Sequence, residues 1–476
     1  MGFNSNLILE SPELETPELE TFELEISESP KPPLTLETFK PPSTLDPATV
    51  LSDNIPTDYI PIATPNLCGN EAKYLMECVQ TNFVSTVGPF VKKFEQELCA
   101  VTKANYAVPT CSGTSALHLS LKAVGVKENE LVIIPSFTFI ATANAIRYCG
   151  SDPWIFDISE KDWGLDPELL EKTLLEQTLL EQTVLKQPVL KQTVLKQTAD
   201  KTLLDKPPLT ESEFSQKTLI HIQSGKRVAA IILVCTLGIP PSINEILDVA
   251  KKFNIPVILD AAGAIGAKYH GKELGELDIP CTVLSFNGNK LITSGGGGCI
   301  LFKDADLANR IRHLSTTARR ATGYLHDEVG YNYRMTNIAA AVGCAQLENL
   351  ELFLKQKKFI ASKYNQLQTK FKSLNIFPNA KENTPNFWLS GFILPNPNLV
   401  NEFIEFMRSF GINAQKFWIP IHKQPPYVNS YCTKQDYVES IYKNIVILPC
   451  SSHLTEKQLD SIISVVTDGL IKLNVK

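Results

Sequence analysis

Four short apolar runs that alternate with helix-like stretches place the tightest constraint on the fold of this chain. Helix-like stretches lie at residues 115–121 and 242–252, and the apolar runs cover residues 131–134, 154–157, 228–234 and 256–260. A strand that is apolar at nearly every position is typical of a sheet covered on both faces, and such sheets are mainly parallel. The sequence therefore predicts an α/β fold built on a mainly parallel sheet.

The length and composition of the chain are sufficient for a large core. With 476 residues and a hydrophobic content of 43%, we expect two domains. The large domain is predicted over residues 59–345. From about Leu347 onward, a long polar helix leads into a mixed pattern of helices and strands, which predicts a smaller α+β domain over residues 346–476.

Charge, cysteine usage and hydropathy exclude several classes of protein. The formal net charge is −6, and no basic patch is large enough to indicate nucleic-acid binding. The eleven cysteines lack the spacing of a metal site, and their odd number without a signal peptide is typical of reduced thiols in the cytoplasm. The longest apolar run, residues 228–239, is too short to span a bilayer. We expect a cytoplasmic protein without metal, membrane or nucleic-acid partners.

Two segments repeat every five residues and depart from the globular pattern. The first lies at residues 12–26, ahead of a Pro-rich stretch, and the second at residues 173–197. Five residues advance about 140° past a full turn of an α-helix, so their leucines cannot form one apolar stripe, and strand alternation is not kept either. We expect a disordered tail over residues 1–58 and a flexible or partly helical surface insertion over residues 173–217.

Lys290 and Asp260 carry the most information about function. Asp260 ends an apolar run, and Lys290 lies thirty residues later, ahead of the glycines 295–298. A lysine amine can form a Schiff base with pyridoxal phosphate (PLP), and a carboxylate can hold the protonated nitrogen of the PLP ring. Taken separately, each residue has an ordinary alternative, because a lysine beside glycines is usually a solvated loop residue and an aspartate after a strand is commonly a turn or cap residue.

Five segments together resemble, in order, the DegT/DnrJ/StrS family of PLP-dependent nucleotide-sugar aminotransferases. They are residues 83–88, 135–146, 285–298, 326–337 and 417–427. The combination is most similar to the branch that aminates C4 of UDP-4-keto-6-deoxy-N-acetylhexosamines, on routes to bacillosamine and legionaminic acid. The resemblance implies the PLP-dependent transferase fold of type I, a homodimer with shared active sites, glutamate as amino donor and a nucleotide-sugar acceptor for surface glycan biosynthesis.

The resemblance also implies a binding site for PLP. Lys290 and Asp260 are its catalytic residues. A small-residue turn that opens an apolar helix would bind the phosphate, because helix N-termini bind anions. The residues of this phosphate site are Gly113, Thr114, Ser115 and Ser285. Without the resemblance, the same turn is an ordinary helix cap.

Two further residues are assigned by the resemblance alone. Phe139 corresponds to the aromatic residue that stacks on the ring, and Asn332 to one that reaches the phosphate from the neighbouring subunit. By itself, Phe139 would be interpreted as a core residue.

Three positions depart from the family pattern. Gly263 stands where a polar side chain is usual, Cys235 where a histidine is usual, and Lys416 where an arginine is common. These departures leave a second interpretation open, in which the chain is a weakened family member that binds PLP or a sugar as a regulatory or scaffold protein. Lys290 favours transamination, because the dehydrating relatives carry a histidine at its position.

Overall fold

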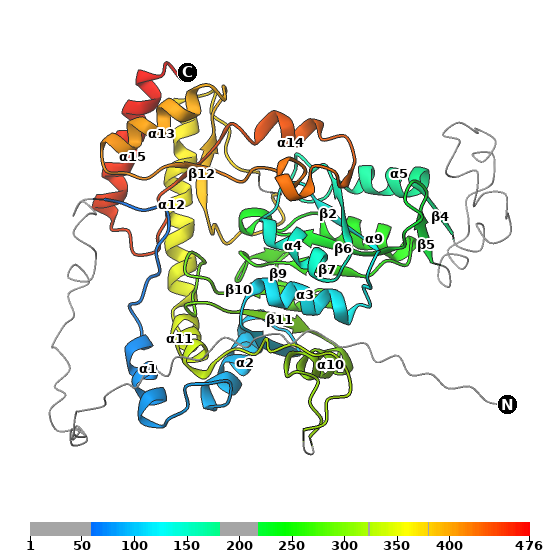
Figure 1. Ribbon diagram of the computed structural model, residues 1–476. Helices are drawn as coiled ribbons and strands as arrows, with labels where there is room; N and C mark the ends of the chain where they lie inside the picture. Colours follow the sequence, from blue (N-terminus) through cyan, green and yellow to red (C-terminus); the bar gives the residue numbers. More distant parts are fainter. Residues whose placement is uncertain (1–58, 181–217, 322–323, 379) are drawn as a thin grey trace, which may run out of the picture. The chain divides into compact units, whose positions relative to one another are not determined.

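An eight-stranded sheet forms the centre of the computed structural model, which describes residues 59–180, 218–321, 324–378 and 380–476 (Figure 1). In spatial order the strands are β1 (Tyr106–Thr110), β11 (Gly298–Phe302), β10 (Cys281–Ser285), β7 (Val257–Asp260), β6 (Val228–Val234), β2 (Leu131–Pro135), β3 (Asp152–Phe156) and β14 (Tyr431–Cys432). The strands β10, β7, β6, β2, β3 and β14 run parallel to one another, whereas β11 is antiparallel to both β1 and β10. The predicted α/β fold with a mainly parallel sheet is confirmed.

Helices cover both faces of this sheet. On one face lie α1 (Glu71–Gln80), α2 (Pro89–Thr102), α5 (Pro167–Gln177), α9 (Ile243–Lys252) and α11 (Asn337–Leu347). On the other lie α3 (Gly113–Ala123), α4 (Ile140–Tyr148) and α10 (Ala305–Ser315). The predicted helices at residues 115–121 and 242–252 correspond to α3 and α9.

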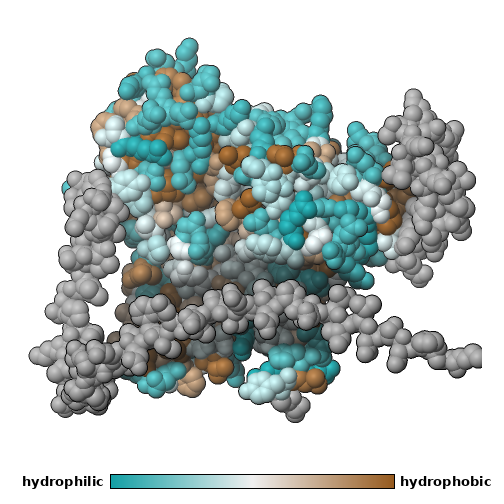
Figure 2. All heavy atoms as spheres, in the orientation of Figure 1, coloured by the Kyte–Doolittle hydropathy of each residue, from teal (hydrophilic) through white to brown (hydrophobic). Residues whose placement is uncertain are grey.

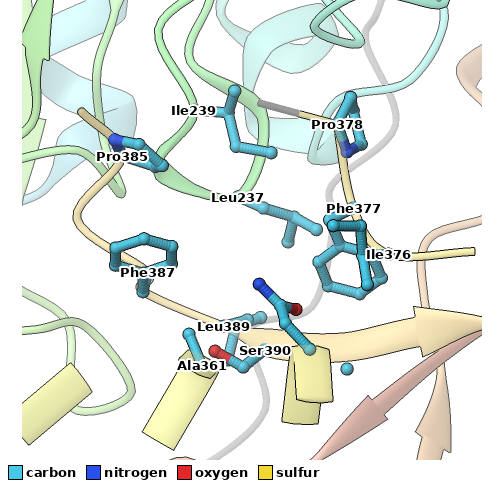
Figure 3. Close-up of a pocket in the computed structure, with 12 residues that line it drawn as sticks. Leu237, Ile239, Ala361, Ile376, Phe377, Pro378, Pro385, Phe387, Leu389 and Ser390 are labelled. Carbon is cyan, nitrogen blue, oxygen red and sulfur yellow. The ribbon is translucent and has the colours of Figure 1, made fainter. Parts of the chain in front are cut away.

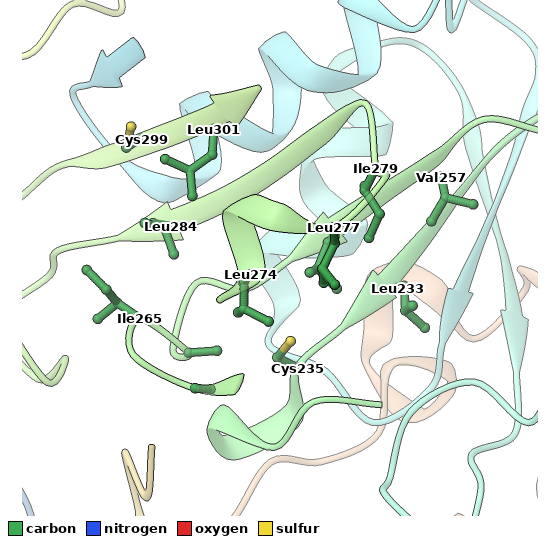
Figure 4. Packing of buried hydrophobic residues seen from close by; sticks show 14 of the residues in the cluster. Leu233, Cys235, Val257, Ile265, Leu274, Leu277, Ile279, Leu284, Cys299 and Leu301 are labelled. Atoms are coloured by element: carbon green, nitrogen blue, oxygen red, sulfur yellow. The ribbon is translucent and has the colours of Figure 1, made fainter. Parts of the chain in front are cut away.

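The two-sided cover explains why the strands are apolar throughout. Every residue of β6 is buried. Leu233 packs in one hydrophobic cluster with Val257 of the neighbouring β7, and with Leu284 of β10 and Leu301 of β11, the next two strands on that side (Figure 4). The adjacent Ile232 packs in the cluster on the opposite face. Because successive side chains of a strand point to opposite faces, both faces require apolar residues.

The C-terminal part of the chain is built on a smaller, antiparallel sheet. Its strands are β12 (Ser390–Ile393), β15 (Ile445–Leu448) and β13 (Gln415–Lys416). The predicted long polar helix is α12 (Leu350–Lys370), and the remaining helices are α13 (Leu399–Ser409), α14 (Asp436–Ile441) and α15 (Glu456–Lys472). Residues Asp58–Lys476 form one compact unit by their contacts, so the boundary between residues 345 and 346 stays a prediction.

Short elements complete the fold. A hairpin joins β8 (Lys268–Tyr269) to β9 (Lys272–Glu273), and β4 (Thr178–Leu180) pairs with β5 (Leu219–His221). The 3₁₀ helices are η4 (Thr236–Gly238), η5 (Leu274–Glu276), η6 (Ile421–Lys423) and η7 (Pro425–Tyr427). Among the residues that the structure describes, no helix has the length and apolar character needed to cross a membrane.

The first eight residues of the predicted repeat insertion, residues 173–180, belong to regular elements. Residues 173–177 complete α5, where Thr173 and Leu174 are buried, and residues 178–180 form β4. A single five-residue unit can extend a helix by one turn, because the drift of the repeat matters only when further units follow. The rest of the insertion, residues 181–217, and the predicted tail, residues 1–58, lie outside the described residues.

Candidate active site

Asp260 is held at the carboxyl end of β7 by two hydrogen bonds. The hydroxyl of Thr142, in α4, donates to its Oδ2 at 2.8 Å, and the backbone N–H of Ala262 donates to its Oδ1 at 3.1 Å. Burial raises the pKa of the Asp260 carboxyl above its ordinary value, while the hydrogen bonds from Thr142 and Ala262 and the charge of Lys290 oppose this rise. The carboxylate is therefore fixed in a buried place where a cationic partner would be favourable.

Lys290 lies on the loop between β10 and β11, and Asp260 acts on it electrostatically. Burial lowers the pKa of the Lys290 amine to about 8, and the Asp260 carboxylate opposes the shift. A lysine with such a pKa is partly neutral near physiological pH, and the neutral amine is the nucleophilic form. The structure thus brings together the two residues that the sequence singled out.

The start of α3 lies beside the end of β10. The hydroxyl of Ser112 caps the helix by accepting from the Ser115 N–H at 3.0 Å. A Cβ atom at Gly113 would lie 2.8 Å from the Cβ of Ser285, so these two predicted residues are in contact. The first N–H groups of the helix, those of Gly113 and Thr114, precede any intrahelical acceptor. The arrangement fits the phosphate of PLP, because it combines free donors, a hydroxyl and the positive end of a helix dipole.

Ser115 itself is directed back into the cap. Its hydroxyl lies 2.8 Å from the Ser112 hydroxyl and 3.2 Å from the Cys111 sulfur, and the residue is buried. A phosphate that Ser115 contacts, as predicted, would therefore also lie near the hydroxyl of Ser112, which belongs to the same turn.

Phe139 is not a core residue. It precedes α4, and 54% of its surface is exposed. Its ring centroid lies 5.8 Å from that of Trp418. An exposed phenylalanine beside a second aromatic ring is suited to pack on a flat ligand.

Asn332 is exposed, and its segment runs along the end of β1. Residues Thr110 and Arg334 form a β-bridge, and the N–H of Cys111 donates to the carbonyl of Tyr333 at 2.8 Å. The predicted role of Asn332 requires a second subunit, so it stays a prediction.

Two of the three departures lie close to Asp260. The N–H of Cys235 donates to the Asp260 carbonyl at 2.9 Å, and burial raises the pKa of the Cys235 thiol well above its usual range. A Cβ atom at Gly263 would lie 2.3 Å from Cε3 of Trp388, so the indole fills this space. The third departure, Lys416, is exposed in β13.

Sequence reasoning missed two residues of the site. Thr142 lies within residues 135–146, which carry the resemblance, but its bond to Asp260 depends on how α4 packs against β2 and β3. Trp388 lies just before β12, and its ring centroid is 3.6 Å from Nζ of Lys290. The absence of a side chain at Gly263 indicated that another residue occupies the space beside it. That signal could not identify the residue as Trp388.

Comparisons with known proteins agree with this geometry. The model of the DegT/DnrJ/EryC1/StrS aminotransferase family matches residues 65–186 and 212–467. A GDP-perosamine synthase from Caulobacter vibrioides is 31% identical over 87% of this chain and 98% of its own. A UDP-4-amino-4,6-dideoxy-N-acetyl-beta-L-altrosamine transaminase from Campylobacter jejuni is 27% identical over 79% of this chain and 88% of its own.

A solved structure shows the same fold. DesV from S. venezuelae aligns with a TM-score of 0.70 at 22% identity, over 87% of this chain and 98% of that one. The predicted PLP-dependent transferase fold of type I is confirmed, and the donor set at Lys290, Asp260 and the start of α3 fits the cofactor. This chain belongs to the DegT/DnrJ/EryC1/StrS aminotransferase family, and its cofactor is pyridoxal phosphate.

Proposed function

We propose that this aminotransferase moves an amino group from glutamate to the 4-keto group of a nucleotide-linked 4-keto-6-deoxy sugar, for surface glycan biosynthesis. The observation that carries the proposal is the pairing of Lys290, whose pKa is lowered to about 8, with the buried carboxylate of Asp260. The names of the relatives from C. vibrioides and C. jejuni both refer to amino sugars carried on a nucleotide, which supports an acceptor of this class.

The acceptor that we favour is a UDP-linked N-acetylhexosamine, because the motif combination is most similar to that branch of the family. A GDP-linked 4-keto-6-deoxy sugar is the second candidate, since the relative that is 31% identical over 98% of its chain is a GDP-perosamine synthase. The two candidates differ in the base and in the substituent at C2 of the sugar, so a direct comparison of substrates separates them.

The proposed chemistry divides between Asp260 and Lys290. When bound, PLP supplies an electron sink for the carbanion formed next to the transferred nitrogen. Asp260 would face the ring nitrogen and hold a proton on it, with Thr142 fixing the direction of the carboxylate. The amine of Lys290 would first bind the cofactor covalently and then, once released, accept and return a proton at its Nζ.

The remaining predicted residues would bind and orient the cofactor. The N–H groups of Gly113 and Thr114, together with the turn at Ser115 and the hydroxyl of Ser285, are proposed to hold the phosphate. Phe139 is proposed to cover one face of the ring.

We also propose that the active form is a homodimer. An apolar surface at α1, the loop after it and α11 supports this proposal, and Figure 2 shows apolar residues at the lower left, at the level of α1 and α11. Its exposed residues are Leu75, Met76, Val79, Phe83, Val84, Val87 and Ile338. This surface borders a pocket of about 370 Å³ that is also lined by Cys111 and by Gly295 and Gly296 of the Lys290 loop. A second copy seated there would lie beside the site and could supply Asn332.

A test of the dimer uses Val79→Glu, Val87→Glu and the double variant. We expect them to sediment as monomers and to bind PLP weakly, because a buried unpaired carboxylate is unfavourable at an apolar interface. A dimer that survives both substitutions would refute this surface.

The cytoplasm is the proposed location. All eleven cysteines lie in the described part of the chain, and none of them forms a disulfide there. Reduced thiols are typical of cytoplasmic proteins.

The function is tested with the purified full-length protein, PLP and glutamate, against a panel of UDP- and GDP-linked 4-keto-6-deoxy sugars. We expect amination of one of them, detected by mass spectrometry, and a visible absorption band of bound PLP that disappears in Lys290→Ala. Binding of PLP without turnover on any member of the panel would instead support the regulatory or scaffold interpretation.

A further inference from the structure

The indole of Trp388 lies directly over the amine of Lys290. The distance from Nζ to the ring centroid is 3.6 Å, and only 4% of Trp388 is exposed. An ammonium group at this distance from an indole face forms a cation–π interaction, and a neutral amine packs on the same surface. Trp388 comes from the segment before β12, whereas Lys290 comes from the loop after β10.

Three polar contacts fix the place of the indole. Its Nε1–H donates to the carbonyl of Asn289, the residue next to Lys290, at 2.7 Å. The Trp388 backbone N–H donates to Oδ1 of Asn386 at 3.0 Å, and its carbonyl accepts from Nζ of the buried Lys357 at 2.8 Å. A ring held at both its polar atom and its backbone has little freedom to move.

The residues beside Trp388 point the other way. Phe387 and Leu389 line an apolar pocket of about 130 Å³ with Leu237 and Ile239, and Trp388 does not (Figure 3). Phe387 has a φ of +56°, in the left-handed region that non-glycine residues rarely adopt. The backbone thus retains an unfavourable conformation at the residue that directly precedes Trp388.

Gly263 and Trp388 form a matched pair. A Cβ atom at position 263 would lie within 3.0 Å of three atoms of the indole, so any side chain there would displace the ring. The amide of Asn386 also donates to the carbonyls of Gly263 and Ile265, at 2.8 and 2.9 Å. The turn that follows Asp260 is therefore tied to the segment that carries Trp388.

We propose that Trp388 is a positioning residue for Lys290, and that Gly263 provides the space which the indole needs. The need is greatest in the part of the proposed reaction in which the Lys290 amine is not bonded to the cofactor. A free lysine side chain has many rotamers, and proton transfer requires a narrow range of them. The indole face restricts the position of Nζ whether the amine is charged or neutral. Loss of the indole therefore lowers the rate of proton transfer and has a smaller effect on the affinity for either substrate.

One test does not depend on the identity of the sugar. In cofactor-free full-length protein, Lys290 is modified with trinitrobenzene sulfonate at fixed pH, and its labelling rate is followed by peptide mass spectrometry. We expect Trp388→Leu to label Lys290 at least fivefold faster than wild type, and Trp388→Phe to stay within twofold. The control Trp154→Phe, a buried tryptophan that packs against Phe156 and His221, should leave the rate unchanged.

The kinetic test rests on the proposed function. With PLP bound, Trp388→Leu should lower kcat about 30-fold while KM for both substrates stays within threefold, and Trp388→Phe should retain most of the wild-type kcat. Gly263→Ala should lower kcat as well, and Gly263→Ala/Trp388→Leu should be no worse than Trp388→Leu alone, because the two changes act through one ring.

Two results would overturn the inference. One is an unchanged labelling rate of Lys290 in a folded Trp388→Leu protein, and the other is a rise of KM at constant kcat, which would make Trp388 a substrate-binding residue. If wild type aminates no sugar on the panel, the proposed function fails while the labelling experiment still decides the role of Trp388.

Discussion

The carboxyl edge of the large sheet and the segment at residues 385–391 contribute to the same site in different ways. At the sheet edge, Asp260 and Ser285 end regular strands and Gly113 begins a helix. Residues 385–389 have no regular structure, yet Trp388 lies 3.6 Å from the amine of Lys290. We expect residues at the sheet edge to carry out the reaction and the segment at residues 385–391 to hold the amine of Lys290 in place. The following predictions test that division.

The largest effect is expected for Lys290→Ala, which should abolish turnover and leave the dimer intact. One amine is required both to bind the cofactor covalently and to move the proton, and alanine can do neither. Turnover is measured by product formation and the assembly by analytical ultracentrifugation. Amination above a trace in the purified variant would show that another residue carries the reaction.

Asp260→Ala should still bind PLP but lose activity by about three orders of magnitude, because the protonated ring nitrogen is what makes the cofactor an electron sink. The measurement is kcat with saturating PLP, alongside the absorption spectrum of the bound cofactor. A rate near that of wild type would mean that Asp260 does not face the ring nitrogen.

Lys290→Met should stabilise the cofactor-free protein by about 3 kcal/mol at pH 7, since the pKa of Lys290 falls from 10.5 to about 8 on folding. Below pH 8 the folded state of wild type carries the full cost of a buried ammonium group. Between pH 8 and 10.5 the folded state loses the proton first, so the part of the difference that comes from ionisation shrinks, and above pH 10.5 that part vanishes. Urea unfolding at several pH values measures it, and a difference that is constant with pH would contradict the lowered pKa.

Thr142→Val should lower kcat about tenfold, because it removes the hydroxyl that donates to Oδ2 of Asp260 at 2.8 Å. This hydrogen bond lowers the pKa of Asp260, so its loss raises that pKa further. The acidic limb of the pH–rate profile should therefore move to higher pH. Thr138→Val, which removes the hydroxyl that contacts Thr142 rather than Asp260, is the matched control and should have a smaller effect.

The smallest effect is expected when residues 1–57 and 181–216 are deleted. Leu180 and Leu219 are paired in β4 and β5, so a short turn can rejoin the chain, and loop length affects stability only logarithmically. PLP absorption, sedimentation and turnover should stay within a few-fold of the full chain. A deletion that begins at residue 173 should be worse, because it removes the buried Thr173 and Leu174.

Much of the site could be predicted because its residues lie at the ends of regular elements. The four apolar runs correspond to β2, β3, β6 and β7 with shifts of at most two residues at any end, so the apolar pattern alone is enough to place Asp260 at the edge of the sheet. The sequence did not show that residues 173–177 belong to α5, since the helix or strand preference of one five-residue unit depends on what packs against it.

The sequence by itself determined the fold class, the family and the pair of Lys290 and Asp260, because strand patterns and motif order are local properties of the chain. Tertiary structure alone decided that Thr142 orients the carboxylate and that Trp388 covers the amine. Those contacts join residues 118 and 98 positions apart, and their geometry depends on the packing of α4 and on the anchors at Asn386 and Lys357. No local pattern encodes a side-chain direction that is set by hydrogen bonds to distant residues.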